Sequence, residues 1–368
     1  MNEHSPLSAL DEYPIHQFPQ PVRIVATSDP RAYERYWFTA QDEAQQFLLV
    51  MGFGYYPNLG TADAYAIFVH DGRHTTVRAH RLLGDDRTVM RTGPLQAEII
   101  EPFRQWRLRL DDNDEDLTVD VRWHDTKRAV FHRMAVNETN TNSHGRLSPE
   151  MVGYESFGRI EGTVRRGGRT FTLSPATTTG SRDHHWGVRD GVGGHIVGPP
   201  RTRTHVGQWV EFSDWSVWDR RILFNLGDER QGAQLLEPFD YRMKFDPETK
   251  HLLGGVIRNR MPDGSVREIR YEPIGDLVAY LRCAMYFGVG GGTPEENYFQ
   301  GSYVGDDVTG GETYDLGDPK TRERIGGFED RLVTATCDGE RTVGILECRN
   351  PLLYDMCREG IPGYGFLD

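Results

Sequence analysis

Residues 181–190 (SRDHHWGVRD) hold the densest set of chemically active side chains in the sequence. They combine two histidines, two aspartates, two arginines and a tryptophan, and Val188 is the only aliphatic side chain among them. Ionisable groups are costly to bury unless they are paired or used in chemistry. The segment is therefore either a structural ion-pair latch or part of a functional site.

The two faces of this segment differ in chemistry if it is a β-strand, because strand side chains alternate between faces. One face would hold Arg182, His184 and Trp186. The other would hold Asp183, His185, Gly187 and Arg189, and Asp183 and Arg189 there suit an ion pair between neighbouring strands. A register error of one residue would exchange the two faces.

The first face offers groups for adding water to a carbon–carbon double bond. Such a reaction needs a proton donor, a surface that stabilises a carbocation and a base for the water. His184 could supply the proton, and Trp186 could stabilise the cation through its π face. Asp214 or Glu211 could act as acid or base in a dry pocket that raises its pKa. The candidate catalytic residues are His184, Asp214 and Trp186.

A second segment, residues 209–218 (WVEFSDWSVW), interleaves carboxylates with indoles. This composition suits an apolar cavity with a few polar anchors, and it suits ordinary barrel filling equally well. As one strand it would place Trp209, Glu211, Ser213, Trp215 and Val217 on one face and Phe212, Asp214, Ser216 and Trp218 on the other. The candidate substrate-binding residues are Arg182, His185, Trp209, Glu211, Phe212, Trp215 and Trp218.

The sequence contains little evidence for a metal-binding or a nucleotide-binding site. The available ligands are Asp183, His184, His185 and His195, but adjacent histidines on a strand point apart and do not easily reach one ion. Residues 288–292 are glycine-rich but lack the lysine of a P-loop, and neither H-E-x-x-H nor G-x-S-x-G occurs. We expect no metal and no cofactor.

The elements that position these residues are predicted to be β-strands almost throughout. Apolar and polar residues alternate in many short runs, among them 64–70, 75–83, 105–110, 117–123 and 332–336. Hairpin signals lie between such runs at Asp71-Gly72, Gly167-Gly168, Asp263-Gly264 and Asp338-Gly339. Helical periodicity is scarce. The sequence predicts an antiparallel all-β protein built from barrels or sandwiches.

An internal repeat indicates two related domains. Residues 99–103 (IIEPF) recur as 235–239 (LLEPF), with similar flanks, one domain length further along the chain. A chain of 368 residues has room for about two domains. We expect β-barrel domains at 1–175 and 176–368. Residues 181–190 would then open the second domain, at an interface of the kind that ligand sites favour.

The overall composition limits the partners. A net charge of −13 argues against nucleic acid, since phosphate binding needs a basic surface. We expect no stable membrane insertion and a cytoplasmic location, because neither an apolar run of about 18 residues nor a secretory signal is found. The cysteines Cys283, Cys337, Cys348 and Cys357 form no C-x-x-C pair and are expected to be free thiols. A homodimer is left open.

The motif at 181–190 closely resembles the (E/D)HSWG-x-RD signature of the hydroxyneurosporene synthase and carotenoid 1,2-hydratase-like group. This lipocalin-like double-barrel superfamily includes AttH-like proteins and fungal decalin-forming Diels–Alderases. Residues 54–68 (GYYPNLGTADAYAIF), residues 92–112 and the hairpin at 168–171 are similar to its bacterial branch. The resemblance spans about residues 45–350 and is specific to the superfamily rather than to one reaction.

The resemblance implies two tandem lipocalin- or calycin-like antiparallel β-barrels with an apolar pocket in or between them. It also implies chemistry on hydrophobic polyenes, terpenoids or polyketides. In carotenoid hydratases, a His-x-Trp pair and a downstream Tyr-x-Asp are implicated in protonating a double bond and directing water. His184 and Trp186 match the first pair. Phe212 and Asp214 match the second, with phenylalanine in place of the phenolic donor.

These observations predict a cofactor-independent enzyme that acts on a hydrophobic small molecule. The expected chemistry is acid–base hydration, dehydration, isomerisation or cyclisation. Two alternatives stay open, a non-catalytic lipocalin-like carrier and a hydrolase or lyase of a phenolic substrate. Loss of turnover with intact ligand binding in His184→Ala and Asp214→Asn would favour the enzyme.

Overall fold

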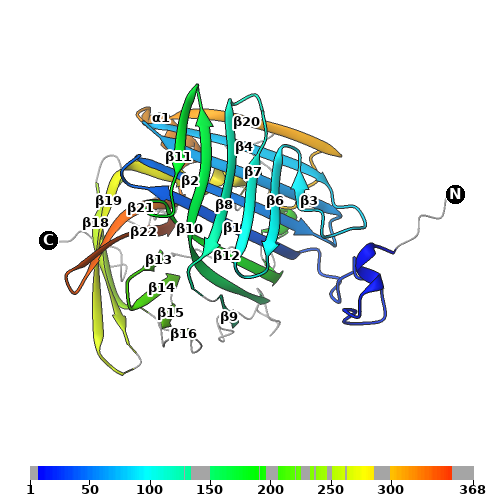
Figure 1. The fold of residues 1–368 in the computed structure, drawn as a ribbon, viewed down its shortest axis with the longest axis horizontal. Coiled ribbons are helices and arrows are strands. Elements are labelled where there is room, and N and C mark those ends of the chain that lie inside the picture. The colour runs from blue at the N-terminus through cyan, green and yellow to red at the C-terminus, as the bar shows by residue number, and fades with distance from the viewer. Residues whose placement is uncertain are drawn as a thin grey trace.

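The computed structural model shows an all-β protein with two antiparallel sheets (Figure 1). The larger sheet is nearly closed into a barrel and the smaller forms a half-barrel, so the predicted fold class is confirmed. The structure describes residues 7–127, 129–133, 150–189, 191–195, 206–219, 221–224, 233–235, 238–246, 251–261, 263–285 and 299–349.

The larger sheet has thirteen strands. They are β1 (Ala32–Asp42), β2 (Phe47–Tyr56), β3 (Thr61–His70), β4 (Arg73–Leu82), β5 (Arg91–Thr92), β6 (Leu95–Glu101), β7 (Gln105–Leu110), β8 (Leu117–Asp125), β9 (Val130–Arg133), β10 (Glu150–Arg166), β11 (Arg169–Leu173), β12 (Thr179–Val188) and β20 (Asp307–Asp315). The nine strands of the smaller sheet are β13 (Val206–Glu211), β14 (Trp215–Asp219), β15 (Arg221–Phe224), β16 (Ala233–Leu235), β17 (Pro238–Phe245), β18 (Leu252–Arg260), β19 (Val266–Tyr280), β21 (Phe328–Cys337) and β22 (Glu340–Arg349).

Helices are short. The α-helix α1 spans Pro319–Ile325, and 3-10 turns cover Ala9–Glu12, Val192–Gly194 and Leu281–Ala284. Within the described ranges, every helix falls short of the length and apolarity needed to cross a bilayer.

The tight hairpins follow from backbone freedom at their tips. Both residues of Asp71-Gly72 adopt positive φ angles, of 50° and 66°, and Asp338-Gly339 adopts 50° and 86°. Positive φ at both positions suits the two-residue turns that match strand twist. The hairpins predicted there, β3–β4 and β21–β22, are confirmed.

The two sheets share a buried apolar layer. Strand β2 is buried along its whole length, because Phe47 and Leu49 point into the barrel while Leu48 and Val50 point toward the smaller sheet. In this layer, side chains from both sheets contact one another, among them Trp37, Ile67, Phe157, Trp209, Trp218, Leu332 and Ile345. A strand buried on both faces reads as a continuous apolar run rather than an alternation.

Strand β12, which carries the 181–190 motif, belongs to the larger sheet. It pairs with β1 on one side and with β10 on the other. The expectation that this segment opens the second barrel was wrong, because similarity between two stretches of sequence does not fix where the chain leaves the first sheet. Strand β20 also returns from the C-terminal half to pair with β4 (Figure 1). The division into domains at 1–175 and 176–368 stays a prediction.

Close packing around Gly180 makes β12 sensitive to added volume. A Cβ atom at Gly180 would lie 2.0 Å from the carbonyl oxygen of Thr39 and 2.6 Å from the Trp123 ring. Gly180→Val should therefore lower the free energy of unfolding by about 1–3 kcal/mol. Gly310→Ala is the control, because a Cβ there meets nothing within 4 Å. Urea unfolding compares the two, and equal midpoints would contradict the packing argument.

Candidate functional site

Strand β12 presents different chemistry on its two faces, as the alternation predicted. Arg182 and His184 contact the rings of Trp106 and Tyr36, which belong to the barrel core. Asp183 and His185 point the other way. His185 there lies within 3.1 Å of Glu155, which accepts a hydrogen bond from Trp209 of the smaller sheet. One face of the motif therefore looks into the barrel and the other toward the junction between the sheets.

His184 lies at the centre of a cluster of aromatic rings. In the strand register it is opposite Tyr36 of β1 and Tyr154 of β10. Its imidazole stacks on Tyr36 with 3.9 Å between ring centroids, and it meets the edge of Tyr154 at 5.1 Å and Trp186 at 5.0 Å. The His184 side chain is 12% exposed, so it is largely enclosed but still reaches solvent.

Glu34 of β1 fixes the orientation of this histidine. Its Oε1 lies 2.9 Å from His184 Nε2, and its Oε2 accepts a hydrogen bond from Arg87 at 2.7 Å. Burial raises the pKa of Glu34, but the hydrogen bond and charge of His184 and the charge of Arg87 outweigh it, so the pKa lies below its usual range. An ionised Glu34 accepts a hydrogen bond from the Nε2–H group, which leaves Nδ1 as the nitrogen that can exchange a proton.

Arg182 contacts the same aromatic cluster through the rings of Trp106 and Tyr154. It is fully buried and donates two hydrogen bonds to Asp125, at 2.8 and 2.7 Å. Its guanidinium lies 5.2 Å from the ring centroid of Tyr154. Burial raises the pKa of Tyr154, and the charge of Arg182 opposes this. Arg182, predicted to bind substrate, thus has Asp125 and Tyr154 as its neighbours.

The opposite face of β12 carries a buried imidazolium. His185 Nδ1 lies 3.1 Å from Asp183 and Nε2 lies 3.1 Å from Glu155. Because a carboxylate faces each ring nitrogen, both nitrogens donate and the ring carries a positive charge. Burial lowers the pKa of His185, but the charges and hydrogen bonds of the two carboxylates outweigh it and raise the pKa to about 9.

Several cations stabilise the ionised carboxylate of Asp183. Burial raises its pKa, but His185, Arg35 and, more weakly, Arg189 outweigh burial and lower it. Arg35 lies 3.9 Å from the carboxylate. The predicted partner Arg189 is thus one contributor, and His185 is the closest. Glu155, Asp183 and His185 are near enough to hold a metal ion, but an imidazolium offers no lone pair, so a metal would first have to displace a proton.

The His185 cluster should make stability depend on alkaline pH. The pKa of about 9 in the folded state lies above the ordinary value of about 6.5. The proton is therefore held more tightly in the folded state, and its contribution is complete below pH 6.5 and is lost as pH rises through 9. Urea unfolding should show stability falling over this window in the wild type and a flatter profile in His185→Gln. Parallel profiles would contradict the imidazolium.

The aromatic segment at 209–218 is a hairpin rather than one strand. Trp209 of β13 pairs with Trp218 of β14, and residues 212–214 form the turn. The predicted faces were wrong, because a reversal in the middle exchanges them. Trp209 and Trp218 pack between the sheets. Phe212 and Trp215 instead stack at 4.9 Å in the core of the smaller sheet.

Asp214, a predicted catalytic residue, lies in this turn. Its side chain is 62% exposed and pairs with Arg267 at 3.3 Å. Among the described residues, the ring and hydrogen-bond partners of His184, which include Glu34 and Tyr154, lie in the larger sheet. The structure therefore brings His184 and Trp186 together but does not bring Asp214 to them. The carboxylate beside His184 is Glu34, which the sequence analysis missed because a strand pairing 150 positions away gives no local signal.

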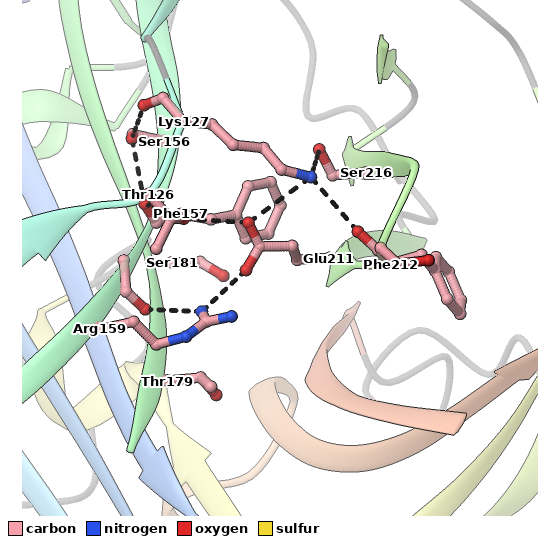
Figure 2. Close-up of polar contacts among 12 residues, drawn as sticks. Thr126, Lys127, Ser156, Phe157, Arg159, Thr179, Ser181, Glu211, Phe212 and Ser216 are labelled. Carbon is pink, nitrogen blue, oxygen red and sulfur yellow. Dashed lines mark hydrogen bonds and ion pairs between the residues drawn. The ribbon is translucent and has the colours of Figure 1, made fainter. Parts of the chain in front are cut away.

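Glu211 links the two sheets (Figure 2). Its carboxylate accepts hydrogen bonds from Arg159 at 2.8 Å and Thr126 at 3.0 Å, and it lies 3.5 Å from Lys127. Burial lowers the pKa of Lys127, and the charge of Glu211 opposes this. The contacts of Glu211 thus join the β13–β14 hairpin to the larger sheet through Arg159 and Lys127.

The interior of the barrel is filled by side chains. An apolar pocket inside it has a volume of only about 10 Å³ and is lined by residues that include Phe38, Met51, Leu108 and Trp123. Pockets for drug-sized ligands are about 300–1,000 Å³. This pocket is therefore too small for a terpenoid or polyene, and the aromatic cluster around His184 is the better candidate for a ligand site.

The fold and site define an all-β protein of two antiparallel sheets, one nearly closed into a barrel and the other a half-barrel. A putative AttH from Nitrosomonas europaea has the same fold, with a TM-score of 0.51 and 14% identity over 96% of this chain and 98% of the other. The predicted resemblance is confirmed at the level of the fold. Kievitone hydratase from Nectria haematococca is more distant, with a TM-score of 0.42 and 9% identity over 86% and 88% of the two chains.

The chain belongs to a family of unknown function (DUF8625), whose sequence model matches residues 7–237. The match includes β12 and the whole His184 cluster. None of the curated proteins matches the chain.

Proposed function

We propose that this chain is a cofactor-independent enzyme of the hydratase type, which adds or removes water at a double bond of a hydrophobic small molecule. The observation that carries the proposal is a histidine oriented by an ionised carboxylate at the centre of an aromatic cluster. His184 and Glu34 form the acid–base pair, with 2.9 Å between Nε2 and Oε1. A positioned histidine is the commonest general acid–base in enzymes.

The reaction uses the two kinds of group present. In the hydration direction, protonated His184 gives its Nδ1 proton to one alkene carbon, and the π electrons form the new C–H bond. The carbocation at the other carbon faces the Trp186 ring, which stabilises positive charge. Water then bonds to that carbon and returns one proton to His184, so the histidine is regenerated. Dehydration is the reverse reaction. Isomerisation follows when the same carbocation loses a proton from another carbon, and cyclisation follows when a second double bond of the substrate attacks it.

The 181–190 motif also supports this proposal, because it resembles the signature of the carotenoid hydratase group. A terpenoid, polyene or polyketide-like molecule is the expected substrate. Three cysteines, Cys283, Cys337 and Cys348, are free and buried, as expected for a reducing compartment such as the cytoplasm. Cys357 lies outside the described residues.

Isotope labelling tests the proposal directly. A panel of polyenes, terpenoids and phenolic polyketides is incubated with the protein in H₂¹⁸O, and products are read by mass spectrometry. We expect a product that gains one ¹⁸O-labelled water, and its formation should be lost in His184→Asn but kept in His124→Asn, which changes an exposed histidine. Binding of panel members without labelling of any would favour a carrier instead.

A further inference from the structure

Two exposed phenylalanines stand at the edge of the His184 cluster. Phe103, between β6 and β7, is 55% exposed, and Phe131 of β9 is 61% exposed. Their ring centroids lie 5.3 Å from Tyr154 and 6.2 Å from Trp186, respectively. Two separate parts of the sheet therefore bring apolar rings to one place, where solvent reaches them.

The backbone at Phe103 is strained. Its φ angle is 60°, in the left-handed region that non-glycine residues rarely adopt. Glycine or asparagine would relax such a turn, and an exposed ring contributes little to a core. Strain at an exposed position motivates a functional hypothesis. A ligand that covers the ring would explain why phenylalanine stands there.

A third exposed apolar side chain, Ile99 of β6, lies near Phe103 along the chain. Ile99 of β6 pairs with Trp106 of β7, and paired residues of antiparallel strands share a face. Trp106 is buried in the barrel core, whereas Ile99 is 42% exposed. The face that holds His184 therefore remains accessible at this end.

The charges in the cluster are balanced within the protein. Glu34 lies between His184 and Arg87, and Arg182 is paired with Asp125. A ligand thus meets ring faces and one histidine rather than an unpaired ion. Ring faces attract other flat π systems in offset or edge-to-face geometry. The site favours a neutral, flat, unsaturated molecule.

We propose that Phe103 and Phe131 are specificity-determining residues that hold the conjugated part of the substrate against Tyr154 and Trp186. They favour conjugated or aromatic ligands over saturated ones of the same size. This inference rests on the proposed function, because it uses the same site and names the substrate class as neutral and conjugated.

A neutral fluorescent probe, N-phenyl-1-naphthylamine, tests the inference on the full chain. Phe103→Leu and Phe131→Leu keep an apolar side chain but remove the ring. We expect each to raise the Kd of the probe about tenfold. We expect the double variant to lose the preference for the probe over 1-cyclohexyldecalin, a neutral saturated competitor of similar size. Leu253→Ser, which changes an exposed apolar residue of β18, is the control and should leave Kd unchanged. Wild-type probe affinity in both leucine variants would overturn the inference.

Turnover separates this inference from the proposed function. Once a substrate is identified, the leucine variants should raise KM about tenfold and keep kcat within twofold, whereas His184→Asn should lower kcat and keep the probe Kd. If no substrate turns over while the leucine variants lose the probe, the inference stands and the proposed function fails. If turnover needs His184 while the leucine variants keep both KM and Kd, the inference alone fails.

Discussion

Replacing His185 with leucine should lower the free energy of unfolding by about 3–5 kcal/mol, because it removes one partner of a buried ion cluster. The His185, Asp183 and Glu155 side chains are 10%, 7% and 2% exposed. Without the imidazolium, two buried carboxylates face each other across an apolar gap. Arg35 lies 3.9 Å from Asp183 and compensates only part of this charge.

A second histidine–carboxylate pair provides the matched control. His124 lies 3.1 Å from Glu161, the same distance as in the His185 pairs, but the two side chains are 38% and 43% exposed. Exposed pairs contribute about 0–1 kcal/mol, so His124→Leu should change stability little. Urea unfolding at pH 7 measures both variants. Similar small losses would show that burial does not set the strength of the His185 cluster.

Removing one carboxylate together with His185 should be less harmful than removing His185 alone. In the double variant His185→Leu and Glu155→Leu, Asp183 keeps the buried guanidinium of Arg35 as its partner at 3.9 Å, so the buried charges stay balanced, and apolar side chains fill similar space. Buried ion pairs replaced by apolar groups are often neutral in stability. The double variant should therefore be more stable than His185→Leu alone, by an amount that thermal unfolding can resolve. A further loss of stability would mean that lost packing, rather than unpaired charge, explains the single variant.

The faces of β12 could be predicted because alternation is a local property of a strand. His184 and His185 were assigned to opposite faces from the sequence, and their contacts confirm it. The partners of those faces could not be predicted. Glu34 is 150 positions from His184, and only the pairing of β1 with β12 brings them together.

In the hairpin at residues 209–218, the alternating aromatic residues obscured the signal of a turn. Ser213 and Asp214 are residue types that favour turns, but the regular spacing of tryptophans suggested an uninterrupted strand. Because the turn lies between Glu211 and Trp215, Trp209 and Trp215 pack in different cores. The prediction that β12 belongs to the second barrel was wrong for a related reason, since a short sequence similarity does not show where the chain changes sheets.

His184→Gln should reduce turnover of a substrate found by labelling by about 10²–10⁴-fold, the usual contribution of a positioned general acid–base. Its effect on unfolding should be well below that of His185→Leu, because His184 lies at the accessible end of the barrel and its partner Glu34 is 30% exposed. Of the two adjacent histidines, His184 would then mainly affect turnover and His185 mainly the free energy of unfolding. Steady-state kinetics and urea unfolding on the same preparations measure both effects.

Glu34 should act through His184 and not on the substrate itself. Glu34→Gln keeps the size of the side chain but removes the charge that orients the Nε2–H donor, so kcat should fall while KM and probe binding hold. Residues that act as a unit give losses that do not add. The double variant with His184→Gln should therefore be no slower than His184→Gln alone. Additive losses would mean that Glu34 contributes independently, and the carboxylate-oriented histidine at the centre of the proposed mechanism would have to be abandoned.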